Sequence, residues 1–203
     1  MKLYINTLGA FDINIEGQSV MDKFCRTDTS DRFFKFFLTF RNKKILPETI
    51  MDNLLANSES DNPENILNTS IFELKRIMES FLPEGSDGDK YISINFANGY
   101  YCMKTGENTK LDVDEFESLI KQGDFEYRRN SEKAIELYDA ALKLYNGAYL
   151  SEIEYEVWLM LSRNYYSRLY IKTVYRLIEM LRERADSEES YISVIRSRLD
   201  DLK

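Results

Sequence analysis

Amide, hydroxyl and cationic side chains gather in one segment of the chain, 63–81, and these groups can hydrogen-bond to base edges and phosphates. They are Asn65, Asn68, Thr69 and Ser70, followed by Lys75 and Arg76. An asparagine amide both donates and accepts, so it can form two hydrogen bonds with adenine. Lysine and arginine hold phosphate oxygens whatever the sequence. The pattern predicts contacts with DNA bases and backbone, although a solvated helix face also has such a composition.

The amino-acid composition does not favour a catalytic function. The chain has no histidine, which removes the Ser-His and Cys-His pairs and the commonest zinc ligand. No glycine-rich phosphate loop is present. Cys25 and Cys102 lie far apart in the sequence, and we expect reduced thiols. The prediction is a binding protein that is not an enzyme and needs no cofactor or metal.

The length and the net charge of the chain limit the number of domains and the kinds of partner. The 203 residues allow one large domain or two small ones, and 43% hydrophobic content is ordinary for a globular protein. No apolar run could span a membrane and the N-terminus lacks a signal peptide, so we expect a cytoplasmic protein. The net charge is −8, and it is −3 over residues 1–104. This slightly acidic balance weighs against indiscriminate nucleic-acid binding.

The elements around the polar segment have the order of a winged DNA-binding domain. A short helix is expected from Pro47 to Leu55, then a polar turn, then a helix over 63–81. The helix has one apolar face, formed by Ile66, Leu67, Ile71, Leu74, Ile77, Met78 and Phe81. Alternating apolar residues over 91–103 flank Asn98-Gly99, the strongest short signal for a hairpin. Helix, turn, helix and hairpin predict a winged helix-turn-helix.

The residues before this motif predict a small sheet and a core helix. Apolar residues alternate from Leu3 to Ile15, which indicates antiparallel strands. Asp31 is expected to cap a helix rich in phenylalanine. On the winged-helix interpretation, Lys43 and Lys44 hold phosphates from the turn after that helix. Asn95 and Asn98 of the hairpin contact the adjacent minor groove or backbone.

The pattern after residue 104 is entirely helical. Val113 and Phe116 mark one helix, and Ser131 is expected to cap a second, which Asn146-Gly147 closes as a left-handed cap. Residues 152–184 carry two apolar faces, one with Trp158, Leu161, Tyr165 and Leu169 and the other with Tyr155, Leu159, Tyr166, Tyr170, Val174, Leu177 and Leu181. A helix with two such faces is typical of a helical-repeat stack. A last helix is expected from residue 186 or 187.

With these elements placed, the chain resembles the antibiotic-regulatory-type bacterial activators. The matching motifs are Leu8-Gly9, Glu48-Thr49-Ile50, Leu74-Lys75-Arg76, residues 97–101 (Ala-Asn-Gly-Tyr-Tyr), residues 113–116 (Val-Asp-Glu-Phe), Ala134, residues 141–147 (Ala-Leu-Lys-Leu-Tyr-Asn-Gly) and Trp158. The resemblance implies an α+β chain: an OmpR-like winged helix at 1–104, and a tetratricopeptide-like bacterial transcriptional activation domain at 105–203. Leu55 and Tyr145 replace tryptophans of that family, and Asn65 and Glu73 stand where arginines are usual. The helical module is also shorter than the family's, which leaves two alternatives, a fragment of a larger protein or a trimmed family member.

Together these observations predict a DNA-binding transcriptional regulator, most simply an activator. The resemblance implies that the loop 56–62 and the helical module contact RNA polymerase. About four basic contacts would give modest affinity, so a homodimer or a second protein, and paired half-sites, are expected. The alternative is a protein-interaction adaptor whose winged helix no longer binds DNA.

Overall fold

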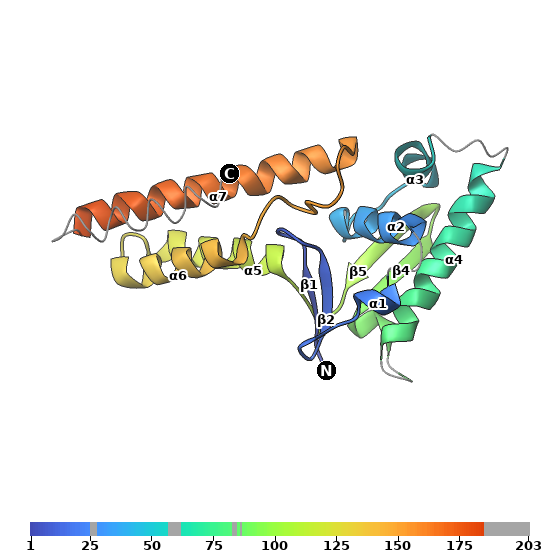
Figure 1. Cartoon of the computed structure of the whole chain (residues 1–203), viewed down its shortest axis with the longest axis horizontal. Coiled ribbons are helices and arrows are strands. Elements are labelled where there is room, and N and C mark those ends of the chain that lie inside the picture. Colours follow the sequence, from blue (N-terminus) through green and yellow to red (C-terminus); the bar gives the residue numbers. More distant parts are fainter. Residues whose placement is uncertain (25–27, 57–61, 83–84, 86, 185–203) are drawn as a thin grey trace. The chain divides into compact units, whose positions relative to one another are not determined.

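The structure is a computed structural model that describes residues 1–24, 28–56, 62–82, 85 and 87–184 (Figure 1). The chain folds into two compact units, and each is made of segments that are separated in the sequence. The first consists of Met1–Ile5, Asp12–Lys110 and Glu156–Trp158. The second consists of Asn6–Phe11, Leu111–Tyr155 and Leu159–Lys203. The α+β class, a winged helix-turn-helix followed by a helical module, is confirmed.

A small sheet opens the chain, as the apolar alternation predicted. It contains β1 (Leu3–Asn6), β2 (Asp12–Ile15), β3 (Gln18–Ser19) and β6 (Thr109–Leu111), in the order β3-β2-β1-β6. Strand β6 belongs to the connection after residue 104, where the sequence pattern predicted only helices. The Leu3 N–H donates to the Asn108 carbonyl at 2.8 Å. The connection therefore takes part in the fold of the sheet.

Two helices follow the sheet, α1 (Met21–Phe24) and α2 (Asp28–Thr39). The phenylalanine stripe of α2 is core, with Phe33, Phe34, Phe36 and Phe37 all buried. The expected cap at Asp31 is wrong, because α2 begins three residues earlier. Asp31 instead accepts a hydrogen bond from Lys35 Nζ at 2.7 Å, one turn along the helix.

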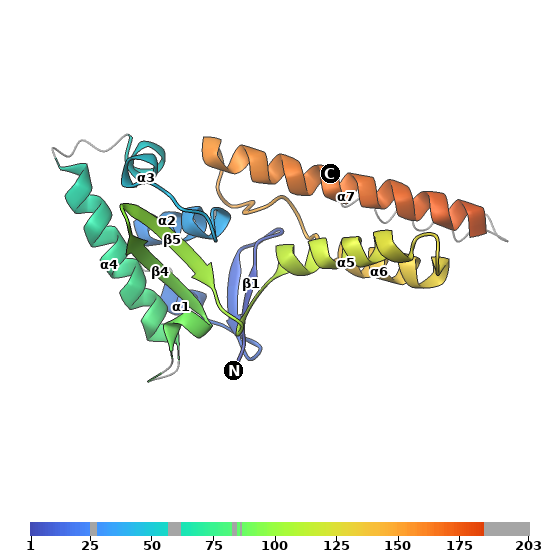
Figure 2. The same ribbon diagram turned by 180° about the vertical axis from the view of Figure 1, so that it is seen from behind.

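The helix-turn-helix and the hairpin form as predicted. They comprise α3 (Pro47–Leu54), α4 (Pro63–Phe81), the short 3₁₀ turn η1 (Gly88–Lys90), β4 (Ile92–Ala97) and β5 (Tyr100–Thr105). Both α3 and α4 start with proline, whose missing N–H would have no helical partner there. Strands β4 and β5 pair antiparallel, and both turn residues, Asn98 and Gly99, have the positive φ that a two-residue hairpin turn requires. Figure 2 shows the hairpin beside α4.

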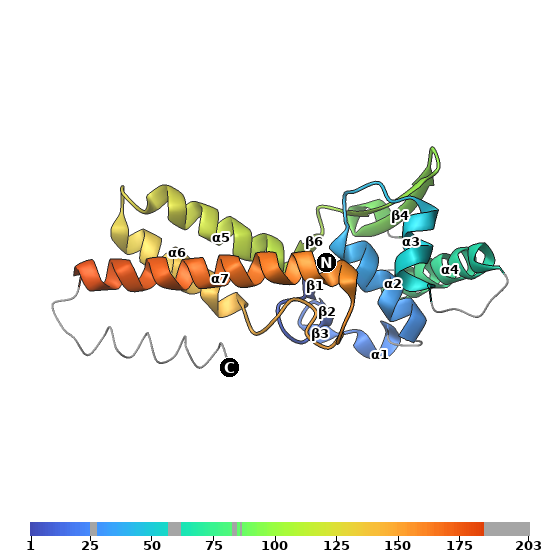
Figure 3. The same cartoon turned by 90° about the horizontal axis from the view of Figure 1, so that it is seen from above.

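Three helices make up most of the described part of the second unit: α5 (Asp112–Glu126), α6 (Ser131–Leu144) and α7 (Val157–Arg184). Helix α7 runs alongside α5 and α6 (Figure 3). The close approach of α5 and α6 depends on Gly123, where a Cβ atom would lie 2.6 Å from the Tyr138 ring. The N-cap of α6 is Asn130, which accepts from the Lys133 N–H at 3.1 Å, so the expected cap at Ser131 is wrong by one residue.

The segment Asn6–Phe11 is bound within the second unit. The Asp112 carboxylate accepts hydrogen bonds from the N–H groups of Thr7 at 2.5 Å and Leu8 at 2.6 Å. Gly9 lies so close to Asn146 that a Cβ atom on Gly9 would be 2.9 Å from the Asn146 carbonyl oxygen. The interpretation of Asn146-Gly147 as a left-handed helix cap is therefore wrong: α6 ends at Leu144, and the pair instead packs against Gly9.

Only one of the two expected apolar faces of α7 is buried. The buried side chains of that face are Leu159, Tyr166, Tyr170, Val174 and Leu177. Trp158, which was predicted on the other face, is also buried and belongs to the first unit. On the other face Leu161 is 82% exposed and Tyr165 is 49% exposed. Tyr155 precedes the helix and is exposed. The prediction that α7 is covered on both sides is thus wrong for the described residues. The helix expected from residue 186 lies outside them.

Candidate nucleic-acid interface

Helix α4 buries one side and exposes the other. Its first turn is capped by Asn62, whose side chain accepts from the Asn65 N–H at 3.0 Å. The buried side faces the core of the first unit through Leu67, Ile71, Leu74, Ile77, Met78 and Phe81. Opposite this side, at helical spacing, lie Asn65, Asn68, Thr69, Phe72 and Arg76, which we call the outer face of α4; all five are exposed.

Ser70 does not belong to this face. It is 6% exposed, on the core side of the helix. Ser70 follows Asn65 by five residues, so at 3.6 residues per turn its side chain points about 140° away from that of Asn65 around the helix axis. The prediction that Ser70 faces bases is therefore wrong.

Phe72 is the member of the outer face that the sequence analysis missed. Its side chain is 62% exposed, although it lies in the middle of a helix with a well-formed core. It follows Asn65 by two helical turns, so projecting the predicted helix onto a wheel would have placed it beside the polar residues.

The hairpin presents a second exposed surface beside α4. Residues from Asn95 to Tyr100 are all exposed, and Phe96 is exposed to 55%. Asn98 occupies the tip with a φ of 53°, and the Asn95 amide donates to the Ser93 hydroxyl at 3.3 Å. Both predicted hairpin asparagines can therefore reach a ligand placed against the hairpin.

One hydrogen bond ties the hairpin to α4. The Tyr101 hydroxyl donates to Asn68 Oδ1 at 3.1 Å, and burial raises the pKa of Tyr101 above its usual range, which keeps it a donor. The amide group of Asn68 is thereby held with its nitrogen free to donate. Since Oδ1 has a second lone pair, it can still accept from a base. Tyr101 thus orients Asn68 for two-point recognition.

The loop carrying Lys43 and Lys44 is fixed against the hairpin. Ile45 and Tyr101 exchange two backbone hydrogen bonds of 2.8 Å, and the Asn42 N–H donates to the Met103 carbonyl at 2.8 Å. The Lys44 ammonium lies 6.0 Å from the centre of the Tyr100 ring. The structure therefore brings both predicted phosphate contacts to the hairpin.

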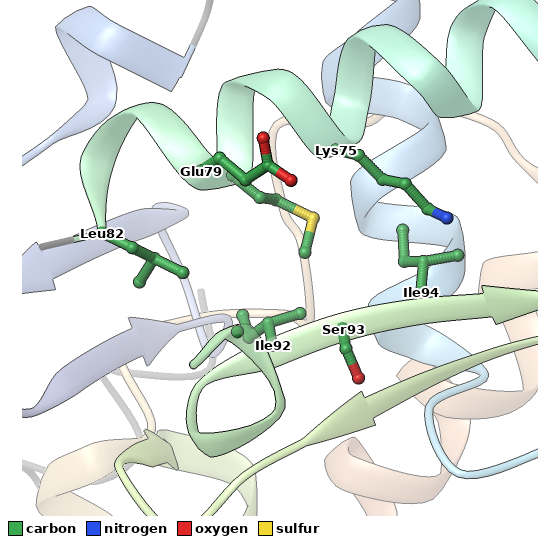
Figure 4. Close-up of a pocket in the computed structure, with 8 residues that line it drawn as sticks. Lys75, Glu79, Leu82, Ile92, Ser93 and Ile94 are labelled. Carbon is green, nitrogen blue, oxygen red and sulfur yellow. The ribbon is translucent and has the colours of Figure 1, made fainter. Parts of the chain in front are cut away.

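Lys75 lies on the side of α4 that faces β4, whereas Arg76 lies on the outer face. Figure 4 shows Lys75 reaching toward Ile94 over a pocket of about 200 Å³, with Met78, Glu79 and Ile92 also lining it. Within the described part of the chain, Lys43, Lys44, Lys75 and Arg76 form no ion pair with a carboxylate. Their charge is therefore available to an anion.

Acidic residues flank the same surface. Glu64, Glu73 and Glu79 are exposed on α4. Because these carboxylates lie on the exposed part of the same helix, they repel a phosphate backbone that approaches the outer face closely. This arrangement favours selective binding at low affinity over strong, indiscriminate binding.

The comparison with protein families identifies the helical part of the chain. Residues 111–199 match the family described as bacterial transcriptional activator domain. The resemblance found in the sequence is thus confirmed for the helical module by this match, and for the fold of the chain by the solved structure described next. The comparison with curated proteins gives no match.

A solved structure has the same fold over almost the whole chain. It is EmbR of Mycobacterium tuberculosis in complex with a low-affinity phosphopeptide, with a TM-score of 0.78 and 15% sequence identity. The alignment covers 99% of this chain and 50% of EmbR, so the chain spans half the length of that protein. In the described residues, no helix is long and apolar enough to cross a membrane.

Proposed function

We propose that this protein is a cytoplasmic transcriptional activator that binds promoter DNA through its winged helix. The observation that supports DNA binding most directly is the outer face of α4: exposed amide and hydroxyl groups beside a protruding hairpin, with unpaired cations around them. In this proposal α4 enters the major groove, where Asn65, Asn68 and Thr69 contact bases.

The remaining polar residues hold the backbone of the DNA in this proposal. Lys43 and Lys44 act from the loop, Lys75 and Arg76 from α4, and Asn95 and Asn98 from the hairpin. Four phosphate contacts per protomer correspond to a slope of about −3 to −4 when log affinity is plotted against log salt concentration. Such binding is modest, so two protomers on paired half-sites are proposed to reach a useful affinity.

Activation is proposed to occur by recruitment of RNA polymerase. The helical module, which matches the activator-domain family, is one contact surface. The loop 56–62 between α3 and α4 is the other, and residues 57–61 of this loop lie outside the described part of the structure. No catalytic role is proposed, because regulators of this class are not enzymes.

A protein-interaction adaptor is the second candidate function. Exposed Phe72 and the three exposed glutamates of α4 favour it, because an aromatic side chain rimmed by charge also fits a protein partner.

DNA selection from a random pool, followed by fluorescence anisotropy at several salt concentrations, separates the two functions. We expect sequence-dependent binding that weakens with salt. Asn68→Ala should bind preferred and random duplexes with more similar affinity, whereas Lys75→Ala should weaken both alike. Lys121→Ala, on the surface of α5, is the matched control and should change neither. If the folded protein shows no salt-sensitive preference for any duplex, the adaptor function is favoured instead.

A further inference from the structure

Phe72 occupies the middle of the outer face of α4 without contributing to the core. It is 62% exposed, whereas six apolar side chains on the opposite side of the same helix are buried. Its neighbours at helical spacing are Asn68 and Thr69 on one turn and Arg76 on the next. An aromatic ring in this place is available to a ligand that already contacts the polar residues around it.

The major groove offers such a ring only one apolar group among the four bases. This group is the C5-methyl of thymine, which apolar side chains contact in direct readout. The rise from Asn65 to Phe72 is about 10 Å at 1.5 Å per residue, the length of about three base pairs. Asn65, Asn68 and Phe72 are therefore spaced to read neighbouring steps of one half-site.

The composition of this stretch points to one kind of base pair. Asparagine pairs best with adenine, and arginine and lysine pair best with guanine. Between Asn65 and Phe72 the exposed face carries two asparagines and no basic residue. Arg76 lies about one turn beyond Phe72, toward the end of α4 that is farther from the base-reading N-terminus.

We infer that Phe72 is a specificity-determining residue that packs on the methyl group of a thymine, so that each half-site has a core of A·T pairs. This inference rests on the proposed function, because it assumes that α4 enters the major groove. It adds the chemical class of the preferred site, to which Asn65 and Asn68 contribute adenine contacts.

The test removes one methyl group at a time from the DNA. Each thymine of the selected duplex is replaced singly by deoxyuridine, and anisotropy gives the Kd for the wild type and for Phe72→Ala. We expect one replacement per half-site to raise the wild-type Kd about fourfold, as the loss of one buried methyl group implies. Phe72→Ala should bind the parent duplex correspondingly weakly and be insensitive to that replacement.

A control variant, and outcomes that separate this inference from the proposed function, complete the experiment. Phe125→Ala removes a similarly exposed ring from α5, 59% exposed, and should keep the wild-type response. Sequence-specific binding with no thymine at which wild type and Phe72→Ala differ overturns the inference and leaves the proposed function intact. No sequence-specific binding at all overturns both. The wild-type replacement series requires no variant, so the absence of an effect at every thymine overturns the inference even if Phe72→Ala fails to fold.

Discussion

Two arginines on the two long helices of this protein show how differently the units use positive charge. Arg163 of α7 donates to four backbone carbonyls, those of Tyr149, Leu150, Ile153 and Glu154. Arg76 of α4 forms no hydrogen bond or ion pair with any other described residue. One guanidinium makes four hydrogen bonds that hold a loop, and the other is exposed to solvent.

Several other cations show the same contrast, although Arg32 and Lys35 of the first unit pair with Glu156 and Asp31. In the second unit, Lys121, Lys133, Lys143, Arg176 and Arg184 all pair with carboxylates. In the first unit, Lys43, Lys44 and Lys75 have no carboxylate partner among the described residues. The net charge of −3 over residues 1–104 therefore understates what a phosphate would encounter at the candidate interface, because a total ignores which charges are already neutralised.

The largest effect is expected at Arg163. Arg163→Ala should lower the free energy of unfolding by about 3 kcal/mol, because four carbonyls lose their donors. Arg163→Lys should recover little of this, since an ammonium cannot reproduce the planar fork. Urea unfolding followed by circular dichroism measures both. A loss below about 0.5 kcal/mol would show that water replaces the guanidinium and would remove the contrast with Arg76.

A smaller effect, on binding alone, is expected at the loop. The double variant Lys43→Ala, Lys44→Ala should reduce the salt slope of DNA binding by about 2 while the urea midpoint stays unchanged. Lys121→Ala, Lys143→Ala removes the same charge from paired lysines of the helical module. It should leave the slope unaltered and cost less than about 1 kcal/mol of stability. Equal salt slopes for the two double variants would show that DNA binding depends on net charge alone and not on which lysines are paired.

The smallest effect on stability is expected at Tyr138, and it appears only at alkaline pH. The Tyr138 hydroxyl donates to the Asp124 carboxylate at 2.6 Å. Burial raises the pKa of Tyr138 from 10.0 to about 12. The unfolded chain therefore loses this proton first, so the contribution is complete below pH 10 and is lost as pH rises toward about 12.

Tyr138→Phe should flatten the fall in stability over this alkaline range, by at most about 1.4 kcal/mol per pH unit. Urea midpoints measured from pH 9 to about 12 check this. Tyr175→Phe, at an exposed position on α7, should behave like the wild type. Identical curves for wild type and Tyr138→Phe would contradict the assignment.

Local patterns predicted the winged helix well. Proline at the start of α3 and α4, the apolar side of α4 and the Asn-Gly turn each depend on residues close in sequence, so their structural outcome could be derived. Ser70 was misplaced because its residue type suggested the opposite of its helical position, and Phe72 was assigned to neither face. Counting at 3.6 residues per turn assigns both correctly.

Long-range contacts could not be derived in the same way. Strand β6 follows Asn108, whose carbonyl accepts a hydrogen bond from Leu3, and no pattern near residue 108 identifies Leu3 as the partner. The Tyr101 to Asn68 hydrogen bond, which orients a candidate base contact, joins residues 33 positions apart. The exposed face of α7 was expected to be covered, because apolar periodicity cannot show whether a neighbour is present.

The discontinuity of both units has a practical meaning for anyone dissecting the protein. A fragment cut after residue 104 would lose Trp158, whose ring packs 5.3 Å from that of Phe36. The complementary fragment would lose the two amides that Asp112 binds near the N-terminus. Severing the chain once therefore damages both products, and an isolated half that fails in an assay says little about what that half does in the intact molecule.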